Sequence, residues 1–314
     1  VKHLCLLVCV SKLKSMAQEL GEVSIEGHVY FSWQREDLKS MEISPLGGTL
    51  GAEIRDIKLK NLDAAVIDAI RTTFLEYLVL VFPNQNLTPA DQIAFTENFG
   101  PVEPHPLRTR DSVAGFPQVL VLENRPGRPG APNDYWHSDI SHAVVPPAAT
   151  VLHALVIPEG HGDTLFCNMV RAYETLSTGL KAAINNLHAL HSGHTTYERS
   201  LGKNDARPIN PAEVKPPQAH PVVRTLPGSG KRALFVNPHF TIGLENMTVE
   251  ESAPILDVLY KAAIRPENIY RHRWRPGDVV IWDNRSTMHY AVLDYTEDML
   301  RKMHRTTAGG EIPR

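Results

Sequence analysis

The sequence of 314 residues has little cysteine: only Cys5, Cys9 and Cys167. So few thiols, odd in number, cannot build a disulfide framework, and we expect a reducing cytoplasm. The sequence also lacks an excess of one charge, because 32 Lys and Arg stand against 35 Asp and Glu, for a formal net charge of -3. That balance provides no electrostatic footprint for nucleic acid or an anionic membrane, so we expect neither as a partner.

Long apolar runs are missing as well, since none approaches the roughly 20 residues that cross a bilayer. The apolar stretch from Leu4 to Val10 is short and has no small-residue cleavage site after it, which makes it a poor signal peptide. The chain begins with Val, whereas Met16 begins a plausible sequence. We therefore expect residues 1–15 to be a leader or a disordered tail and 16–314 to form a single domain.

The sequence does contain many short elements separated by turns. Apolar residues at helical spacing predict helices at 63–78, 89–99 and 254–264. Apolar runs between turn signals predict strands at 79–82, 149–157, 233–237 and 278–282. Strands dominate from about residue 135 onward, so the pattern predicts a mainly β domain with peripheral helices (α+β), as a β-sandwich or jelly roll.

The segment 203–221 carries five prolines and cannot be helix or strand throughout. Long loops in compact domains are often lids, so we expect a lid-like insertion near 192–218.

The stretch NDYWHSDISH at 133–142 places His137 and Asp139 two residues apart. In an extended chain these side chains project from one face and can reach one point. RPGDVVIWDNRSTMHYAV at 275–292 is interpreted as a hairpin whose second strand carries His289. Two histidines and one carboxylate leave three coordination positions open, the arrangement of non-haem Fe(II) oxygenases.

Other interpretations of these residues stay open at this point. An H-x-D triplet alone is weak evidence, and a zinc hydrolase or a non-catalytic jelly-roll binding module would explain part of the pattern. Arg301 and Arg305 lie four apart and point the same way on a helix or a strand. Buried guanidinium groups are costly unless anions pair with them, so this pair indicates two anionic ligands, the alternative being a solvated basic edge.

Taken in order, these stretches resemble the taurine/2-oxoglutarate dioxygenase family, part of the Fe(II)- and 2-oxoglutarate-dependent dioxygenases. The resemblance extends from about residue 40 to 314 and is carried by FGPVEPHP (99–106), NDYWHSD (133–139), GDTLFCN (162–168), RAYETLS (171–177), HPVVRT (220–225), ALFVN (233–237), WRPGDVVIWDNRSTMHYAVLDY (274–295) and MHRTT (303–307). It implies a double-stranded β-helix (jelly roll) and an enzyme that uses Fe(II), 2-oxoglutarate and O2.

The resemblance further implies roles for particular residues. His137, Asp139 and His289 would hold the iron and carry the catalysis. Thr164 and Arg301 would hold the distal carboxylate of 2-oxoglutarate. The residues expected to contact the substrate are His105, Asn133, Arg305 and the backbone N–H of Ile140.

One residue departs from the family pattern. In the taurine enzyme a tyrosine stands three residues after the histidine that binds the sulfonate. The matching histidine here is His105, and three residues later this chain has Arg108. A guanidinium facing the pocket would repel a substrate ammonium group, so the substrate would then lack an amine or carry a second anion. If Arg108 points to solvent, taurine stays a candidate.

The resemblance thus implies hydroxylation of a small anionic organic substrate. We expect an alkyl sulfonate, taurine-like, with release of sulfite and an aldehyde; the alternative is an alkyl sulfate ester or another small carboxylic acid. A carboxylate at Asp139 disfavours halogenation, because related halogenases have a small residue there. A homo-oligomer, dimeric or tetrameric, is compatible with the resemblance.

Overall fold

The computed structural model describes residues 24–25, 28–29, 41–106, 111–127, 130, 133–201, 212 and 214–314. Its helices are α3 (Ala64–Tyr77), α4 (Pro89–Glu97), α5 (Met169–Glu174), α6 (Thr178–Ile184), α7 (His194–Leu201), α8 (Val249–Ala263) and the 3-10 turn η3 (Pro266–Asn268). Its strands are β1 (Ser24–Ile25), β2 (His28–Val29), β3 (Glu42–Pro45), β4 (Ala52–Arg55), β5 (Val79–Phe82), β6 (Ser112–Val113), β7 (Phe116–Asn124), β8 (Ala149–Val156), β9 (Thr164–Asn168), β10 (His188–His191), β11 (Gln218–Pro221), β12 (Val223–Thr225), β13 (Arg232–Leu234), β14 (Thr241–Leu244), β15 (Ile269–His272), β16 (Val279–Asp283), β17 (Thr287–Ala291) and β18 (Arg301–Ala308).

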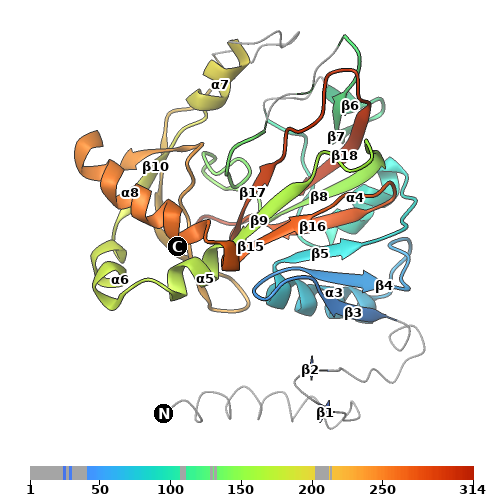
Figure 1. The fold of residues 1–314 in the computed structure, drawn as a ribbon, viewed down its shortest axis with the longest axis horizontal. Coiled ribbons are helices and arrows are strands. Elements are labelled where there is room, and N and C mark those ends of the chain that lie inside the picture. The colour runs from blue at the N-terminus through green and yellow to red at the C-terminus, as the bar shows by residue number, and fades with distance from the viewer. Residues whose placement is uncertain are drawn as a thin grey trace.

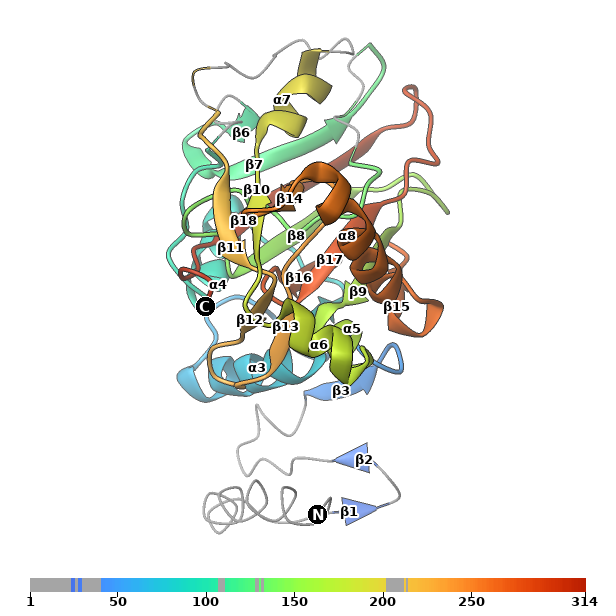
Figure 2. The same cartoon turned by 90° about the vertical axis from the view of Figure 1, so that its left-hand side faces the viewer.

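The core is a sandwich of strands flanked by helices (Figures 1 and 2). The large sheet has eight strands in the order β3-β4-β5-β16-β8-β18-β7-β6. Across the interior lie smaller sheets, ordered β15-β9-β17, β11-β10-β14 and β12-β13. Residues of α3 and α4 pack on the outer face of the large sheet, and residues of α5 and α8 pack against the smaller sheets. The prediction of a mainly β jelly roll with peripheral helices is confirmed.

Alternation along the strands divides the apolar residues between two layers. In β5, Val79 and Val81 join the cluster between the sheets, whereas Leu80 and Phe82 join the cluster under the outer helices. Strands buried on both faces read as continuous apolar runs, which is why VLVF has no polar position. The same phase places Leu152 of β8 in the inner cluster, so Thr150, two residues earlier, also faces inward.

The predicted helices form where capping residues start them. The side chain of Asp63 accepts a hydrogen bond from the Val66 N–H at the start of α3, and Thr88 forms a capping box with Asp91 at the start of α4. Helix α8 begins five residues earlier than predicted, because Thr248 and Glu251 form another capping box. The strand predicted at 233–237 is shorter than expected and forms only over Arg232–Leu234.

The predicted hairpin over 275–292 is wrong. β16 pairs with β5 and β8 in the large sheet, whereas β17 pairs with β9 in a smaller one. Between them the Ser286 N–H and the Thr287 hydroxyl donate to the Asp283 carbonyl, closing a tight turn. The chain therefore crosses from one sheet to the other, and β17 lies across the interior from β16. The local sequence marked the turn but not the partners of the strands.

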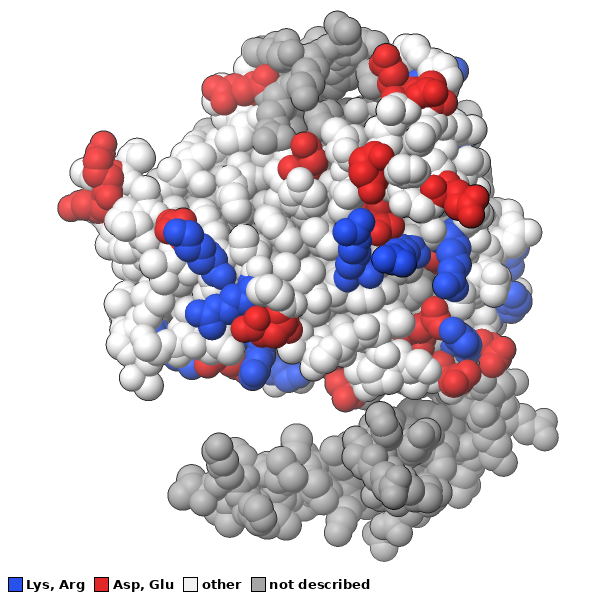
Figure 3. Space-filling model, viewed as in Figure 1, with Lys and Arg blue, Asp and Glu red and all other residues white. Residues whose placement is uncertain are grey.

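Two features of the surface bear on the expected partners. Acidic and basic side chains are interspersed over the face drawn in Figure 3, in keeping with the near-zero net charge. Within the described ranges, every helix is too short or too polar to traverse a bilayer.

A buried ion pair connects the last residues of the chain to β12. The guanidinium of Arg224 is 1% exposed, stacks on Phe235 and donates from Nη2 to Glu311. Arg285 Nη1 also lies 3.6 Å from Glu311 Oε2. Burial lowers the pKa of Arg224 to about 10, but at neutral pH the side chain is still a cation that needs its anion.

We predict that Glu311→Ala lowers the free energy of unfolding by about 2 kcal/mol, less than for a fully buried pair because Glu311 is itself partly exposed. Urea unfolding followed by circular dichroism measures the change. Glu76→Ala, which removes an exposed glutamate from α3, is the matched control. Equal midpoints for both variants would show that Arg224 does not depend on Glu311.

Candidate metal centre

Three side chains from distant parts of the chain meet in the interior. The structure brings together donor atoms of His137, Asp139 and His289, all within 4.8 Å of one another. The Nε2 atoms of both histidines lie 3.7 Å from Asp139 Oδ1. The three residues are 6%, 3% and 7% exposed. Two imidazoles and one carboxylate that converge in this way fit a divalent ion such as Fe(II).

Backbone pairing, rather than strand alternation, brings these side chains together. His137 and His289 form an isolated antiparallel bridge, with N–H to carbonyl distances of 3.0 and 2.8 Å. Beyond His137 the chain turns, and Ile140 takes a positive φ of 49°. Asp139 is therefore in a turn and not on the extended strand that the sequence predicted. The turn directs the carboxylate toward the histidines. The expectation that residues two apart in an extended chain share a face therefore selected the right residues but assumed the wrong backbone conformation.

A buried polar network holds the carboxylate of Asp139. The Thr150 hydroxyl donates to Asp139 Oδ2 at 2.7 Å and accepts from Asn284 Nδ2 at 2.9 Å. Asn284 Oδ1 accepts from the Trp282 indole at 3.0 Å and from the Asp139 backbone N–H at 3.3 Å. With Oδ2 engaged in this way, Oδ1 is the oxygen that faces the two histidines. Such outer partners fix the orientation of metal-binding side chains and tune affinity.

Protonation states in the centre suit metal binding at neutral pH. His137 Nδ1 lies 2.9 Å from the Tyr135 carbonyl, which can only accept, so Nδ1 carries the proton and Nε2 has a free lone pair. Burial lowers the pKa of both His137 and His289. Burial alone would raise the pKa of Asp139, but the Arg305 guanidinium, together with the hydrogen bond from Thr150, holds it well below its usual range. The centre is thus one carboxylate with two neutral imidazoles.

The residues predicted to hold the cosubstrate lie on facing strands. Trp274 donates its indole N–H to Thr164 Oγ1 at 2.9 Å. Arg301 is 8% exposed; its Nη2 donates to the Gly162 carbonyl at 3.2 Å, and its Nε has no hydrogen-bond partner among the described residues. A Cβ at Gly162 would lie 2.7 Å from Arg301 Nε, so glycine is needed for the guanidinium to fit. A buried cation with an unused donor fits a carboxylate ligand.

Arg305 lies on the same face of β18 as Arg301, about 13 Å further along at 3.3 Å per residue. Its Nη2 is 3.1 Å from Asp139 Oδ1, yet the angles are not those of a hydrogen bond, and neither its Nε nor its Nη2 has a hydrogen-bond partner within the part of the chain described. The alternative of a solvated basic edge is wrong, because the Arg305 side chain is only 11% exposed. The guanidinium has donors to spare for a second anion.

The other residues predicted to contact the substrate stay predictions. Asn133 is half-buried; its Oδ1 accepts from the Tyr135 hydroxyl at 3.0 Å, and its carbonyl accepts from the Ala291 N–H. His105 is half-buried in the segment between α4 and β6. Arg108 lies outside the described residues. The expected lid is described in part: its first portion forms α7, whereas 202–211 and 213 lie outside the described residues.

Sequence reasoning missed several residues that shape the centre: Thr150, Asn284, Trp274, Tyr135 and His239. Two of them had a detectable signal. Thr150 is a polar residue in the apolar run ATVLHALVI, at the phase that faces inward. Tyr135 lies inside the quoted NDYWHSD stretch. The contacts of Asn284, Trp274 and His239 depend on tertiary packing, which spacing along the chain does not encode.

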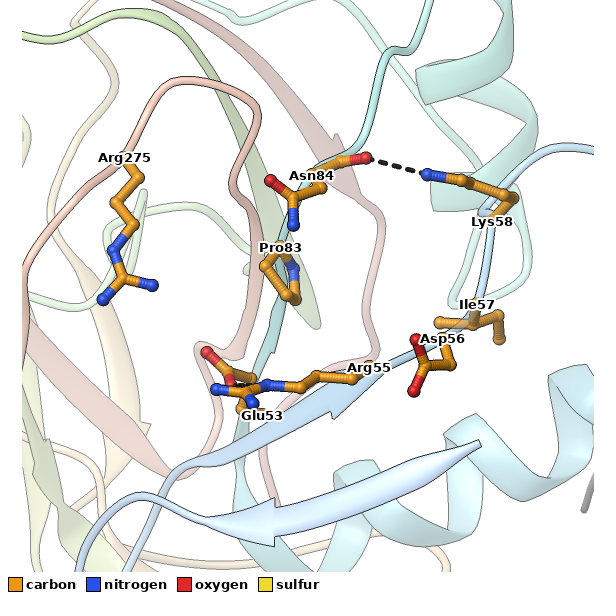
Figure 4. Close-up of a pocket in the computed structure, with 8 residues that line it drawn as sticks. All are labelled: Glu53, Arg55, Asp56, Ile57, Lys58, Pro83, Asn84 and Arg275. Atoms are coloured by element: carbon orange, nitrogen blue, oxygen red, sulfur yellow. Dashed lines mark hydrogen bonds and ion pairs between the residues drawn. The ribbon is translucent and has the colours of Figure 1, made fainter. Parts of the chain in front are cut away.

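A separate hollow of about 430 Å³ opens at the surface near β4 and the end of β5 (Figure 4). Lys58 Nζ donates to the Asn84 carbonyl at 3.1 Å across one side of it, and Arg55 pairs with Glu53 on another. The lining residues are Glu53, Arg55, Asp56, Ile57, Lys58, Pro83, Asn84 and Arg275. None of them belongs to the metal centre, so this hollow is not its entrance.

The similarity to known proteins extends over most of the chain. The model of the taurine catabolism dioxygenase TauD, TfdA family matches residues 42–307. The chain is 35% identical to an alpha-ketoglutarate-dependent sulfate ester dioxygenase of Pseudomonas putida, over 87% of this chain and 91% of that protein. It is 32% identical to a (S)-phenoxypropionate/alpha-ketoglutarate-dioxygenase of Sphingobium herbicidovorans, over 80% of this chain and 89% of that protein. The crystal structure of a taurine dioxygenase from Burkholderia xenovorans superposes with a TM-score of 0.74 at 32% sequence identity. The match covers 87% of this chain and 92% of that one.

We predict that Thr150→Val lowers the affinity for a divalent metal by about 10- to 100-fold, because it removes the hydroxyl that orients Asp139 without changing the volume. Titration with Mn(II), followed by calorimetry, measures the loss. Thr306→Val is the matched control, since Thr306 is also buried but its hydroxyl contacts Thr96 and Gln92 on the outer face of the sheet. An affinity equal to that of the control would mean that Asp139 needs no support from Thr150.

Proposed function

The chain belongs to the taurine catabolism dioxygenase TauD, TfdA family, and from that premise we propose that it hydroxylates an alkyl sulfonate, which then breaks down to an aldehyde and sulfite. It is an Fe(II)- and 2-oxoglutarate-dependent dioxygenase, as membership and its relatives show. When bound, the iron and 2-oxoglutarate together supply the O2-dependent oxidation of a C–H bond. The chain's own residues supply binding, orientation and exclusion of water.

We assign the iron to His137, Asp139 and His289 as its ligands. The assignment is supported by their convergence, by the free Nε2 of His137 and by the carboxylate of Asp139, which stays ionised at neutral pH. Trp282 and Phe166 pack against the His289 ring at centroid distances of 4.8 and 6.2 Å. These aromatic faces keep bulk water from the ring, so the charged groups interact in a low-dielectric interior.

The observation that carries the proposal is the pair of buried guanidinium groups on β18. Arg301 and Arg305 point into the interior that holds the metal centre, and each has an Nε without a hydrogen-bond partner among the described residues. Two unused cationic donors call for two anionic ligands. We assign Arg301, with Thr164, to the distal carboxylate of 2-oxoglutarate, and Arg305, with His105, Asn133 and the Ile140 N–H, to the anionic end of the substrate. Arg108 is a further candidate for that end.

Substrate breakdown follows from where hydroxyl is added. A carbon that carries both hydroxyl and sulfonate loses sulfite and becomes an aldehyde. A carbon that carries hydroxyl and a sulfate ester oxygen loses sulfate instead. The sulfate ester reaction is the second candidate, because the relative of that activity in Pseudomonas putida is 35% identical over most of both chains.

We further propose that the enzyme acts in the cytoplasm as a single domain over 16–314, alone or as a homo-oligomer. Cys167, the one cysteine among the described residues, is a free buried thiol. Burial raises its pKa to about 12, so it is an inert thiol that forms no disulfide here. This agrees with a reducing compartment.

A substrate panel tests the reaction. We expect succinate from butanesulfonate or taurine together with stoichiometric sulfite, because the arginine pair is suited to a second small anion. Release of sulfate from butyl sulfate would select the second candidate, and turnover of phenoxyacetate alone would contradict both. Asp139→Ala is the control and should form no succinate above background, since the only carboxylate of the proposed ligand set is gone.

We predict that each arginine binds a different anion, Arg301 the 2-oxoglutarate and Arg305 the substrate. Arg305→Ala should raise KM for the substrate by roughly 100-fold, the effect of removing one partner of a buried charge pair, with little change in KM for 2-oxoglutarate. Arg301→Ala should show the reverse. Initial rates of succinate formation, with each ligand varied in turn, measure both values. Equal losses for the two ligands in either variant would contradict the division.

A further inference from the structure

Tyr135 connects three parts of the site. Its carbonyl accepts from His137 Nδ1 at 2.9 Å, and its hydroxyl donates to Asn133 Oδ1 at 3.0 Å. Its ring stacks on the ring of His239, with centroids 3.8 Å apart and planes at 18°. One half-buried tyrosine therefore touches a proposed metal ligand, a proposed substrate residue and a histidine about 100 positions away in the chain.

His239 continues the connection to α7. The His239 side chain is buried, and its Nε2 lies 2.9 Å from the Thr196 hydroxyl. Its carbonyl accepts from the Thr195 hydroxyl at 2.8 Å. Just before the helix, the Ser192 N–H donates to the Phe240 carbonyl at 2.8 Å. These contacts attach the start of α7 to residues 239 and 240.

Helix α7 depends on such contacts for its position. It has only 8 residues, and helices of that length are not stable on their own in water. Residues 194 and 198 are exposed, Thr195, Thr196 and Tyr197 are half-buried, and the hydroxyls of the two threonines contact His239. In Figure 1 the helix lies at the top of the molecule, apart from α5, α6 and α8. Among the contacts of the described residues, the hydrogen bonds to His239 and Phe240 attach α7 to the rest of the domain.

We propose that Tyr135 and His239 are a positioning pair that transmits the docking of α7 to Asn133, and so sets the substrate side of the metal centre. His137 has other restraints, including the backbone bridge to His289, so the pair acts on substrate binding and not on metal binding. The role of Asn133 rests on the proposed function; the attachment of α7 through His239 does not.

The first experiment measures the attachment without any ligand. Hydrogen exchange of the α7 amides is compared in the wild type, His239→Phe, Thr196→Val and the double variant. His239→Phe keeps a ring to stack on Tyr135, and both single variants remove the same hydrogen bond. We expect each single variant to exchange about fivefold faster, the size of one hydrogen bond, and the double variant to exchange no faster than either. Thr72→Val is the matched control, because the Thr72 hydroxyl donates to the Asp68 carbonyl of its own helix.

The second experiment measures the consequence for binding, with butanesulfonate, or with butyl sulfate if the panel selects it. Tyr135→Phe keeps the stack and removes the hydroxyl that holds Asn133. We expect it and His239→Phe to raise KM for the substrate about fivefold, with kcat, KM for 2-oxoglutarate and Mn(II) affinity unchanged.

Three results would overturn the proposal. One is α7 exchange that is unchanged in His239→Phe. Another is additive acceleration in the double variant, which would show that the two side chains act separately. The third is a rise in both KM values together, which a general loss of structure would produce. If the panel yields no substrate at all, the proposed function fails, and the exchange measurement still decides whether His239 holds α7.

Discussion

The backbone bridge between His137 and His289 is the constraint on which the site depends. Two hydrogen bonds join the segment that precedes β8 to a strand of the opposite sheet, 152 positions further along the chain. Each imidazole is thereby placed by its own main chain before any metal contributes. Asp139 then needs only a turn and the hydroxyl of Thr150 to aim one oxygen at both rings. A donor set held this way is organised in advance, so little conformational freedom is lost when an ion binds.

Charge burial explains the rest of the interior. A jelly roll offers two apolar faces, and here the alternation along β18 directs the guanidinium groups of Arg301 and Arg305 inward, whereas a turn directs the carboxylate of Asp139 there. Asp139 is stabilised by Arg305 and by the hydroxyl of Thr150, whereas Arg301 contacts the Gly162 carbonyl and the ring of Tyr295. Burying Arg301 is unfavourable unless an anion arrives to pair with it, and Arg305 keeps donors to spare beyond its ion pair with Asp139. The two buried guanidinium groups are therefore suited to bind two anionic molecules beside one metal.

Much of the fold could be predicted because it follows from local patterns. Capping residues and apolar spacing located α3 and α4, and the continuous apolar runs located β5, β8 and β16. Local patterns failed where pairing partners matter. The segment 275–292 carries a strong turn signal, yet its two strands belong to different sheets. A turn signal shows where the chain reverses but not with which strands the flanking segments pair. The sequence likewise did not predict that the ring of Tyr135 stacks on the ring of His239, because such stacking depends on how distant segments pack.

The sequence by itself determined the residue types and their order: an H-x-D, a distant histidine, two arginines four apart and the turns between short strands. Those residue types indicate the chemistry, because a reaction needs particular donor atoms and the chain records them directly. The family followed from the ordered stretches that resemble it. Only the tertiary structure decided that Asp139 lies in a turn, that Thr150 and Asn284 hold it, and that α7 is attached through His239. The physical reason is that hydrogen bonds and ring contacts act over a few ångströms in space, whatever the separation along the chain.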